Sequence, residues 1–109
     1  MTVTPFQQRV YEAVLRISRG RVATYKGVAD AIGCGAPRAV GQALRNNPFA
    51  PRVPCHRVIA ADLTPGGFQG EAAGLSRRRK LALLASEGIR FEAGKLADPT
   101  RLFVFTRKG

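Results

Sequence analysis

The sequence contains no tryptophan, one methionine, one histidine and two cysteines in its 109 residues. Two cysteines are too few for the disulfide framework of a small secreted domain, and with a single histidine they make no convincing zinc site. We therefore expect no metal ion. A chain with so little cysteine is also expected in a reducing compartment, so a cytoplasmic location is predicted.

Long apolar runs and acidic side chains are also scarce. No apolar run approaches the roughly 20 residues of a membrane-spanning helix, and the N-terminus lacks the basic and apolar segments of a secretory signal. Asp and Glu number 7 against 18 Lys and Arg, which gives a formal net charge of +11. This balance predicts an anionic partner, and the abundance of arginine favours the phosphates of nucleic acid. A basic protein without such a partner is the alternative.

Apolar residues recur at helical spacing in four segments of the chain. Thr4 and Pro5 have the residue types that begin a helix, and we expect the first helix to run from there to Gly20. A second helix is predicted to follow the cap residue Thr24, and the fourth to follow the cap residue Ser76. The last three predicted helices cover about residues 25–32, 37–45 and 77–86.

The glycine-rich turn at residues 33–36 joins two of these short helices, which is typical of a helix-turn-helix. The helix over 37–45 carries Arg38, Gln42 and Arg45, as expected of a helix that lies against DNA. A helical pair with no DNA-binding role is the alternative. We expect a mainly α single domain over residues 1–109, with a helix-turn-helix (winged-helix-like) core, an active-site loop and short extended segments.

The only histidine directly follows one of the two cysteines, within residues 53–58. A thiol is a weak nucleophile until it loses its proton, and the pKa of a free cysteine is near ~8.5. His56 and Arg57 beside Cys55 favour the thiolate, and Pro54 restricts the backbone that directs the thiol. The alternative is a small buried hydrophobic cysteine next to a histidine whose polar atoms are satisfied in the core.

The stretch Pro54-Cys55-His56-Arg57-Val58 resembles the active-site motif of the O6-alkylguanine-DNA alkyltransferases. These repair proteins accept an alkyl group from guanine O6 onto the motif cysteine, and they need no metal or organic cofactor. The resemblance implies that Cys55 attacks as the thiolate while His56 takes the thiol proton through water. Glu87, in a segment similar to the family's Leu-Leu-x-x-Glu-Gly, is implied to accept a hydrogen bond from His56. An exposed carboxylate at a helix end is the alternative.

The same resemblance gives roles to three residues that precede the motif. Tyr25 is implied to press on the phosphate of the target nucleotide, and either Tyr25 or a second donor is implied to protonate the leaving guanine. Arg38 is implied to fill the gap left by the flipped base, because O6 is inaccessible in a stacked pair. Asn47 is implied to order the active-site loops. The competing interpretations are a half-buried aromatic residue, a phosphate contact and a helix cap, respectively.

Two sets of site residues follow from the resemblance and the helix pattern. The expected DNA contacts are Tyr25, Arg38, Gln42, Arg45 and Arg57. The expected base pocket is lined by Leu44, Val53, Pro54, Val58, Phe68 and Gln69. Phe68 and Gln69 replace the family's usual tyrosine and small hydroxyl residue, and their loop is longer than usual. These departures change the predicted shape of the pocket and the range of alkyl groups that it accepts.

Two other functions compete with direct repair of O6-alkylguanine in double-stranded DNA. The absence of a ribonuclease-H-like domain ahead of the helices resembles the alkyltransferase-like proteins. Those damage sensors usually lack the reactive cysteine and hand lesions to nucleotide excision repair proteins. A plain helix-turn-helix regulator explains the charge but leaves the Cys-His-Arg match accidental. We rank stoichiometric repair by a monomer first, the sensor second and the regulator third.

Overall fold

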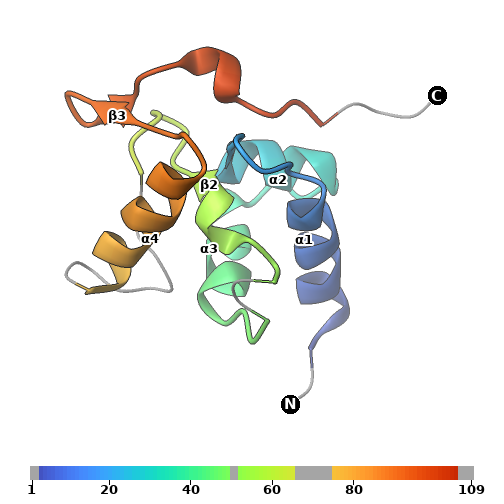
Figure 1. Ribbon diagram of the computed structural model, residues 1–109. Coiled ribbons are helices and arrows are strands. Elements are labelled where there is room, and N and C mark those ends of the chain that lie inside the picture. Colours follow the sequence, from blue (N-terminus) through green and yellow to red (C-terminus); the bar gives the residue numbers. More distant parts are fainter. Residues whose placement is uncertain (1–2, 50–51, 66–74, 106–109) are drawn as a thin grey trace.

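The computed structural model describes residues 3–49, 52–65 and 75–105. Figure 1 shows the four α-helices of these ranges, which are α1 (Pro5–Leu15), α2 (Tyr25–Ala31), α3 (Pro37–Arg45) and α4 (Leu75–Ser86). The other elements are the strands β1 (Ala23–Thr24), β2 (Val58–Ile59), β3 (Phe91–Glu92) and β4 (Lys95–Leu96), and the 3-10 turns η1 (Cys55–Arg57) and η2 (Pro99–Arg101). The expected mainly α fold with short extended segments is confirmed.

Helix α1 begins where the sequence predicts but ends earlier. The hydroxyl of Thr4 accepts a hydrogen bond from the Gln7 amide at 3.0 Å, and the Gln7 side chain accepts one from the Thr4 amide at 2.9 Å. The predicted continuation to Gly20 is wrong, because the helix ends at Leu15 and the next two amides bond only three residues back. This tighter turn directs the buried Ile17 into the core. Gly20 lies in the loop that follows, with φ +88°.

Helices α2 and α3 form the expected helix-turn-helix. The Thr24 hydroxyl caps α2 by accepting a hydrogen bond from the Gly27 amide at 2.9 Å. The Cys34 amide closes the turn by donating to the Ala29 carbonyl at 2.8 Å, and Gly33 adopts φ +71°, where glycine is favoured. The buried residues of α3 are Val40, Ala43 and Leu44.

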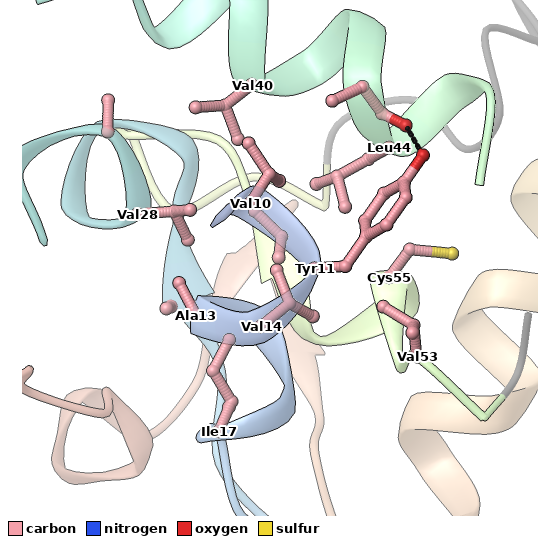
Figure 2. Packing of buried hydrophobic residues seen from close by; sticks show 14 residues of the cluster. Val10, Tyr11, Ala13, Val14, Ile17, Val28, Val40, Leu44, Val53 and Cys55 are labelled. Atoms are coloured by element: carbon pink, nitrogen blue, oxygen red, sulfur yellow. Dashed lines mark hydrogen bonds between the residues drawn. The ribbon is translucent and has the colours of Figure 1, made fainter. Parts of the chain in front are cut away.

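A two-stranded parallel sheet separates two apolar clusters. Strand β1 pairs with β2 so that Ala23 lies opposite Val58. Ala23 and Val58 belong to the first cluster, which is built mainly by α1, α2 and α3. The neighbouring residues Val22 and Ile59 point to the opposite face and belong to the second cluster, with Leu84 of α4. Figure 2 shows the first cluster, in which side chains from the three helices pack together.

Helix α4 places an unusual set of residues against the rest of the molecule. It begins before Ser76, so this residue lies inside the helix and is not its cap. Lys80 and Leu84 are fully buried, whereas Ala85 is exposed. Lys80, Leu84 and Glu87 are spaced four and three residues apart, so they lie on one side of the helix and its C-terminal extension. That side meets η1, the turn that contains the cysteine-histidine pair.

The C-terminal segment packs back on the helices. Strands β3 and β4 form an antiparallel hairpin, and after η2 the chain pairs Leu102 with Val22 in a parallel bridge. The Phe103 amide donates to the Val22 carbonyl at 2.7 Å. The rings of Phe103 and Phe105 lie edge to face, 4.9 Å apart, and pack against the first cluster. In Figure 1 this segment crosses over the top of the molecule, from the hairpin toward α1 and α2.

Candidate active site

Cys55 begins the turn η1, which leads directly into β2. Its amide donates to the Val53 carbonyl at 2.8 Å, and Pro54, with φ −80° and ψ 69°, precedes the turn. Val53, Pro54 and Val58 are all buried, and 4% of the Cys55 surface is exposed. In Figure 2 Cys55 lies at the margin of the first cluster beside Val53 and Tyr11, and its sulfur points away from α1.

Tyr11 forms part of the surroundings of Cys55, although the sequence pattern does not distinguish it from a core residue. Its hydroxyl donates to the Ala43 carbonyl at 2.7 Å, which joins α1 to α3 (Figure 2). Its ring meets the ring of Phe49 edge to face at 5.9 Å. Burial, and then the proximity of the Cys55 thiolate, raise the pKa of Tyr11. Tyr11 is therefore a neutral, fixed wall beside the thiol.

The surroundings of Cys55 favour its protonated form. Burial raises the pKa of the Cys55 thiol, while hydrogen bonding with Asn47 and the charge of Lys80 lower it without cancelling the effect of burial. A thiol in this state attacks well only when a base takes its proton during the reaction. The next residue in the chain is the candidate for that base.

His56, Glu87 and Arg57 form one hydrogen-bonded network. Nε2 of His56 lies 3.0 Å from Oε2 of Glu87. Arg57 donates from Nε to Oε1 of Glu87 at 2.9 Å and from Nη2 to Oε2 at 3.0 Å. Burial alone raises the pKa of the Glu87 carboxyl, but hydrogen bonds from Arg57 and His56 outweigh it and bring the pKa to about 2. Glu87 is thus a carboxylate at neutral pH. Its side chain is only 5% exposed, so it is not the exposed carboxylate of the alternative interpretation.

The same network determines where His56 carries its hydrogen. Because a carboxylate only accepts, Nε2 bears the hydrogen that points to Glu87. Burial lowers the pKa of His56 in spite of its bond to Glu87, so the ring is neutral at neutral pH. Nδ1 is buried and has no hydrogen-bond partner among the residues that the structure describes. His56 therefore presents a buried nitrogen lone pair that is able to accept a proton.

Asn47 connects the end of α3 to the cysteine turn. Its side-chain amide donates to the Val53 carbonyl at 3.0 Å, and its Oδ1 accepts from the Phe49 amide at 2.9 Å. The residue is buried, so each bond satisfies a group that water does not reach. This geometry fits the expectation that Asn47 orders the loop ahead of Cys55.

Tyr25 and Lys80 approach the site from α2 and α4. Burial, and then the nearby Cys55, raise the pKa of Tyr25 to about 12, so its hydroxyl keeps its proton at neutral pH. The Nζ of Lys80 donates to the Val58 carbonyl at 2.7 Å and lies 5.7 Å from the centre of the Tyr25 ring. Lys80 was not anticipated as a site residue. Its position seven residues before Glu87, on the same helix side, is the signal that could have revealed it.

The α3 side chains expected to contact DNA share one exposed side of that helix. Arg38, Gln42 and Arg45 are all exposed, while Leu44 is buried in the same cluster as Cys55. Arg57 lies apart from them, since its guanidinium bonds to Glu87 and only 16% of its side chain is exposed. The structure thus places Arg57 in the histidine network and not on the α3 surface. Two expected pocket residues lie outside the described residues, namely Phe68 and Gln69.

The described ranges hold neither a cluster of metal ligands nor a helix that could span a membrane. Across 3–49, 52–65 and 75–105, no three or more His, Cys, Asp or Glu side chains gather in a way that would hold a metal ion. The helices in those ranges are all too short or too polar to span a bilayer. The functional groups gathered around Cys55 are an imidazole, a carboxylate, an ammonium group and two phenols.

A known protein family matches most of this chain. A family model described as "6-O-methylguanine DNA methyltransferase, DNA binding domain" matches residues 5–89. The matched range includes α1, the helix-turn-helix, the Cys55 turn, α4 and Glu87. The hairpin β3–β4 and the segment after it lie beyond the match.

The curated relatives match this chain over about half of their own length. A methylated-DNA–protein-cysteine methyltransferase of Saccharolobus islandicus is 45% identical over 86 residues, which cover 79% of this chain and 52% of the relative. A protein of the same name from Mycobacterium bovis is 49% identical over 79 residues, or 72% of this chain and 46% of the relative. The chain thus spans about half the length of these relatives.

Two solved structures illustrate the range of similar folds. Mycobacterium tuberculosis OGT in complex with DNA matches with a TM-score of 0.64 and 46% identity, over 79% of this chain and 51% of that one. S. pombe Atl1, in complex with damaged DNA containing O6-carboxymethylguanine, matches with a TM-score of 0.78 and 30% identity, over 94% of this chain and 98% of that one. With the family match over residues 5–89, these likenesses show that the chain belongs to the family of the 6-O-methylguanine DNA methyltransferase DNA-binding domain.

Proposed function

We propose that this chain repairs double-stranded DNA directly, by taking the alkyl group of an O6-alkylguanine onto Cys55 in a single stoichiometric reaction. The observation that supports this most strongly is the setting of His56. Its Nε2 faces Glu87 at 3.0 Å, and its buried Nδ1 has no partner among the described residues. A histidine held in this way, on the residue after Cys55, is able to act as a general base for the thiol. The shared name of the two curated relatives supports the same reaction.

The reaction requires no group beyond those of the site and the lesion. The Cys55 sulfur attacks the alkyl carbon, and the new S–C bond forms as the bond between that carbon and guanine O6 breaks. The thiol proton passes through a bridging water to Nδ1 of His56, and the Glu87 carboxylate stabilises the imidazolium. The leaving guanine takes a proton from the Tyr25 hydroxyl, whose pKa is about 12. The imidazolium proton then restores the tyrosine.

Access to O6 requires that the damaged nucleotide rotate out of the duplex, since O6 is blocked inside a stacked pair. We assign Arg38, exposed near the start of α3, to the gap left by the flipped base. Gln42 and Arg45 lie along the same exposed side and would contact the duplex. Tyr25, at the first position of α2, would press on the phosphate of the rotated nucleotide. The net charge of +11 adds attraction for any DNA sequence.

A damage sensor is the second candidate function, and the likeness to Atl1 favours it. That protein was solved with DNA containing O6-carboxymethylguanine, and the match covers 98% of its chain with a TM-score of 0.78. A sensor would bind the lesion, leave the alkyl group in place and rely on excision repair proteins. The presence of Cys55 beside a histidine that is already bonded to Glu87 favours transfer.

Counting repaired lesions per protein chain distinguishes the two functions. A duplex with one O6-methylguanine is supplied in excess over the protein, and the restored guanine is quantified when the reaction stops. Direct repair predicts a plateau at one restored guanine per active chain. Lesion binding with no restored guanine would select the sensor, and continued turnover beyond the plateau would contradict stoichiometric transfer.

A further inference from the structure

Arg57 is the one residue of the Cys-His-Arg sequence to which the proposed reaction gives no role. Its guanidinium bonds to three fixed acceptors: Oε1 of Glu87 at 2.9 Å, Oε2 of Glu87 at 3.0 Å and the Ile17 carbonyl at 2.9 Å. A planar guanidinium that binds both oxygens of a carboxylate fixes its orientation as well as its position. The carboxylate held in this way is the one that faces His56.

We propose that Arg57 is a positioning residue that directs the Glu87 carboxylate to Nε2 of His56 and thereby keeps Nδ1 as the proton acceptor. This inference rests on the proposed function, because the state of Nδ1 matters only if His56 takes the thiol proton. Oε2 of Glu87 accepts from both Arg57 and His56, so the two bonds share one atom. A carboxylate that turns away from the arginine therefore also turns away from the imidazole.

The anchor of Arg57 arises from the early end of α1. In a continuous helix the Ile17 carbonyl would accept from the Arg21 amide, but that amide donates to Ser18 instead, at 3.1 Å. The Ile17 carbonyl is therefore available to Nη1 of Arg57. Arg101 holds the same loop from the other side, by donating from Nη1 to the Gly20 carbonyl at 3.1 Å. Arg101 is thus a matched arginine that supports the loop but does not bond to Glu87.

The charges around His56 show what the loss of Arg57 would change. Glu87 and Lys80 face the ring from the α4 side, Arg57 faces it from its own turn, and the Cys55 thiol is adjacent in the chain. Glu87 favours the imidazolium, whereas the positive charges of Arg57 and Lys80 oppose it. Without Arg57 the Glu87 carboxylate is released from Nε2, and the loss of its bond and charge outweighs the loss of the Arg57 charge, so the pKa of His56 falls further. The ring would stay neutral to lower pH, but its hydrogen would no longer be fixed on Nε2.

The single histidine of the chain makes a direct test possible, since every imidazole nitrogen signal comes from His56. Nitrogen-15 NMR distinguishes the two tautomers, and a pH titration gives the pKa. The wild-type protein is expected to show hydrogen on Nε2 and a pKa below the ordinary value of about 6.5. Hydrogen mainly on Nδ1 in the wild-type protein would overturn the proposal without recourse to any variant.

Variants then test whether Arg57 is responsible. Arg57→Ala should lower the pKa of His56 further, mix the two tautomers and move the acid limb of the single-turnover transfer rate to lower pH. Arg57→Lys keeps the charge but cannot bind both oxygens, so it should restore part of the pKa and leave the tautomers mixed. Arg101→Ala should lower thermal stability through the shared loop without moving the pKa, the tautomer or the acid limb.

The outcomes separate positioning from simple support of the fold. Equal NMR changes in Arg57→Ala and Arg101→Ala, or unchanged NMR signals in Arg57→Ala, would show that Arg57 acts only through stability. The NMR measurements use the folded protein without DNA, so they decide the role of Arg57 even if no alkyl transfer is detected. A failure of the proposed function would instead appear as an intact histidine network in a protein that leaves the lesion unrepaired.

Discussion

At the scale of single residues, Cys55 combines burial with the need to react. Burial raises the pKa of its thiol, which disfavours the thiolate that attacks. Two groups meet this need: a neutral imidazole on the next residue, His56, and the buried ammonium group of Lys80, whose charge lowers the pKa of the thiol. The thiol is therefore kept protonated in the protein without DNA, and this limits its side reactions with electrophiles.

The first prediction concerns Lys80. Lys80→Met removes a charge that lowers the pKa of the Cys55 thiol, so the pKa should rise further and reactivity at neutral pH should fall. The measurement is the pH dependence of alkylation by iodoacetamide in a Cys34→Ser background, where Cys55 is the remaining thiol. Lys26→Met is the control, because Lys26 is an exposed lysine that pairs with Asp30 on the surface of α2. An identical pH profile for Lys80→Met and the wild-type protein would contradict this role.

At the scale of elements, α3 presents the surface that the proposed function places against DNA. Its inner side carries Val40, Ala43 and Leu44, and its outer side carries the exposed arginines. Gly41 lies near the middle of α3. A methyl group added at Gly41 would meet no atom within 4 Å. Glycine inside a helix weakens it by roughly 0.5–1 kcal/mol relative to alanine. A glycine at this position would allow a DNA backbone to approach α3 closely, which is a reason for Gly41 in spite of its cost to the helix.

The second prediction follows from this open position. Gly41→Ala should stabilise the protein by up to about 1 kcal/mol, because alanine favours the helix and meets no clash here. If α3 lies against DNA, the same methyl group should weaken duplex binding. Thermal unfolding and a binding titration on the same sample measure both effects. Higher stability with unchanged affinity would show that this side of α3 does not face the duplex.

The third prediction tests whether Arg38 acts in base flipping. Arg38→Ala should slow transfer from duplex DNA by about tenfold or more, even at saturating protein, because unstacking a base costs a few kcal/mol. Transfer from a free O6-alkylguanine base should be nearly unchanged, since that base needs no flipping. Arg45→Ala is the matched variant at the other end of α3, and saturating protein should restore its rate. Equal losses on duplex and free base for Arg38→Ala would exclude the flipping role.

Particular elements show what the sequence can and cannot reveal. The start of α1 and the bounds of α3 were predictable from local effects, because Thr4 caps its helix and Pro5 and Pro37 have a backbone angle that suits a first helical position. The end of α1 was not predictable. A glycine often marks the end of a helix, but α1 stops at Leu15, five residues before Gly20. The burial of Lys80 was missed because its acceptor, the Val58 carbonyl, lies 22 residues away.

At the scale of the whole molecule, the histidine network joins segments that are distant in the chain. Arg57 reaches back 40 residues to Ile17 and forward 30 residues to Glu87. The resemblance to the alkyltransferases was enough to predict that His56 and Glu87 meet, and the structure places them 3.0 Å apart. The two hydrogen bonds from Arg57 to Glu87 had no local signal in the sequence, and the expected contact of Arg57 with DNA stays a prediction.

The fourth prediction is a pH dependence of folding stability. Burial lowers the pKa of His56 in the folded protein, whereas an unfolded histidine titrates near about 6.5. The unfolded state therefore binds the proton first, and stability should fall as pH decreases below that value. Urea unfolding between about pH 7.5 and 5, a range around the unfolded pKa, measures the effect. His56→Gln should remove most of the decline, and a wild-type stability that stays flat or increases over this range would contradict the account.

The most direct test of the central claim is the mass of the protein after reaction with a duplex that contains O6-methylguanine. Direct transfer to Cys55 predicts a gain of one methyl group per chain, located by peptide mapping on Cys55. Cys34→Ala should gain the methyl group normally, whereas Cys55→Ala should gain none while still binding the damaged duplex. An unchanged wild-type mass, or a methyl group found on Cys34, would contradict the claim that Cys55 is the acceptor.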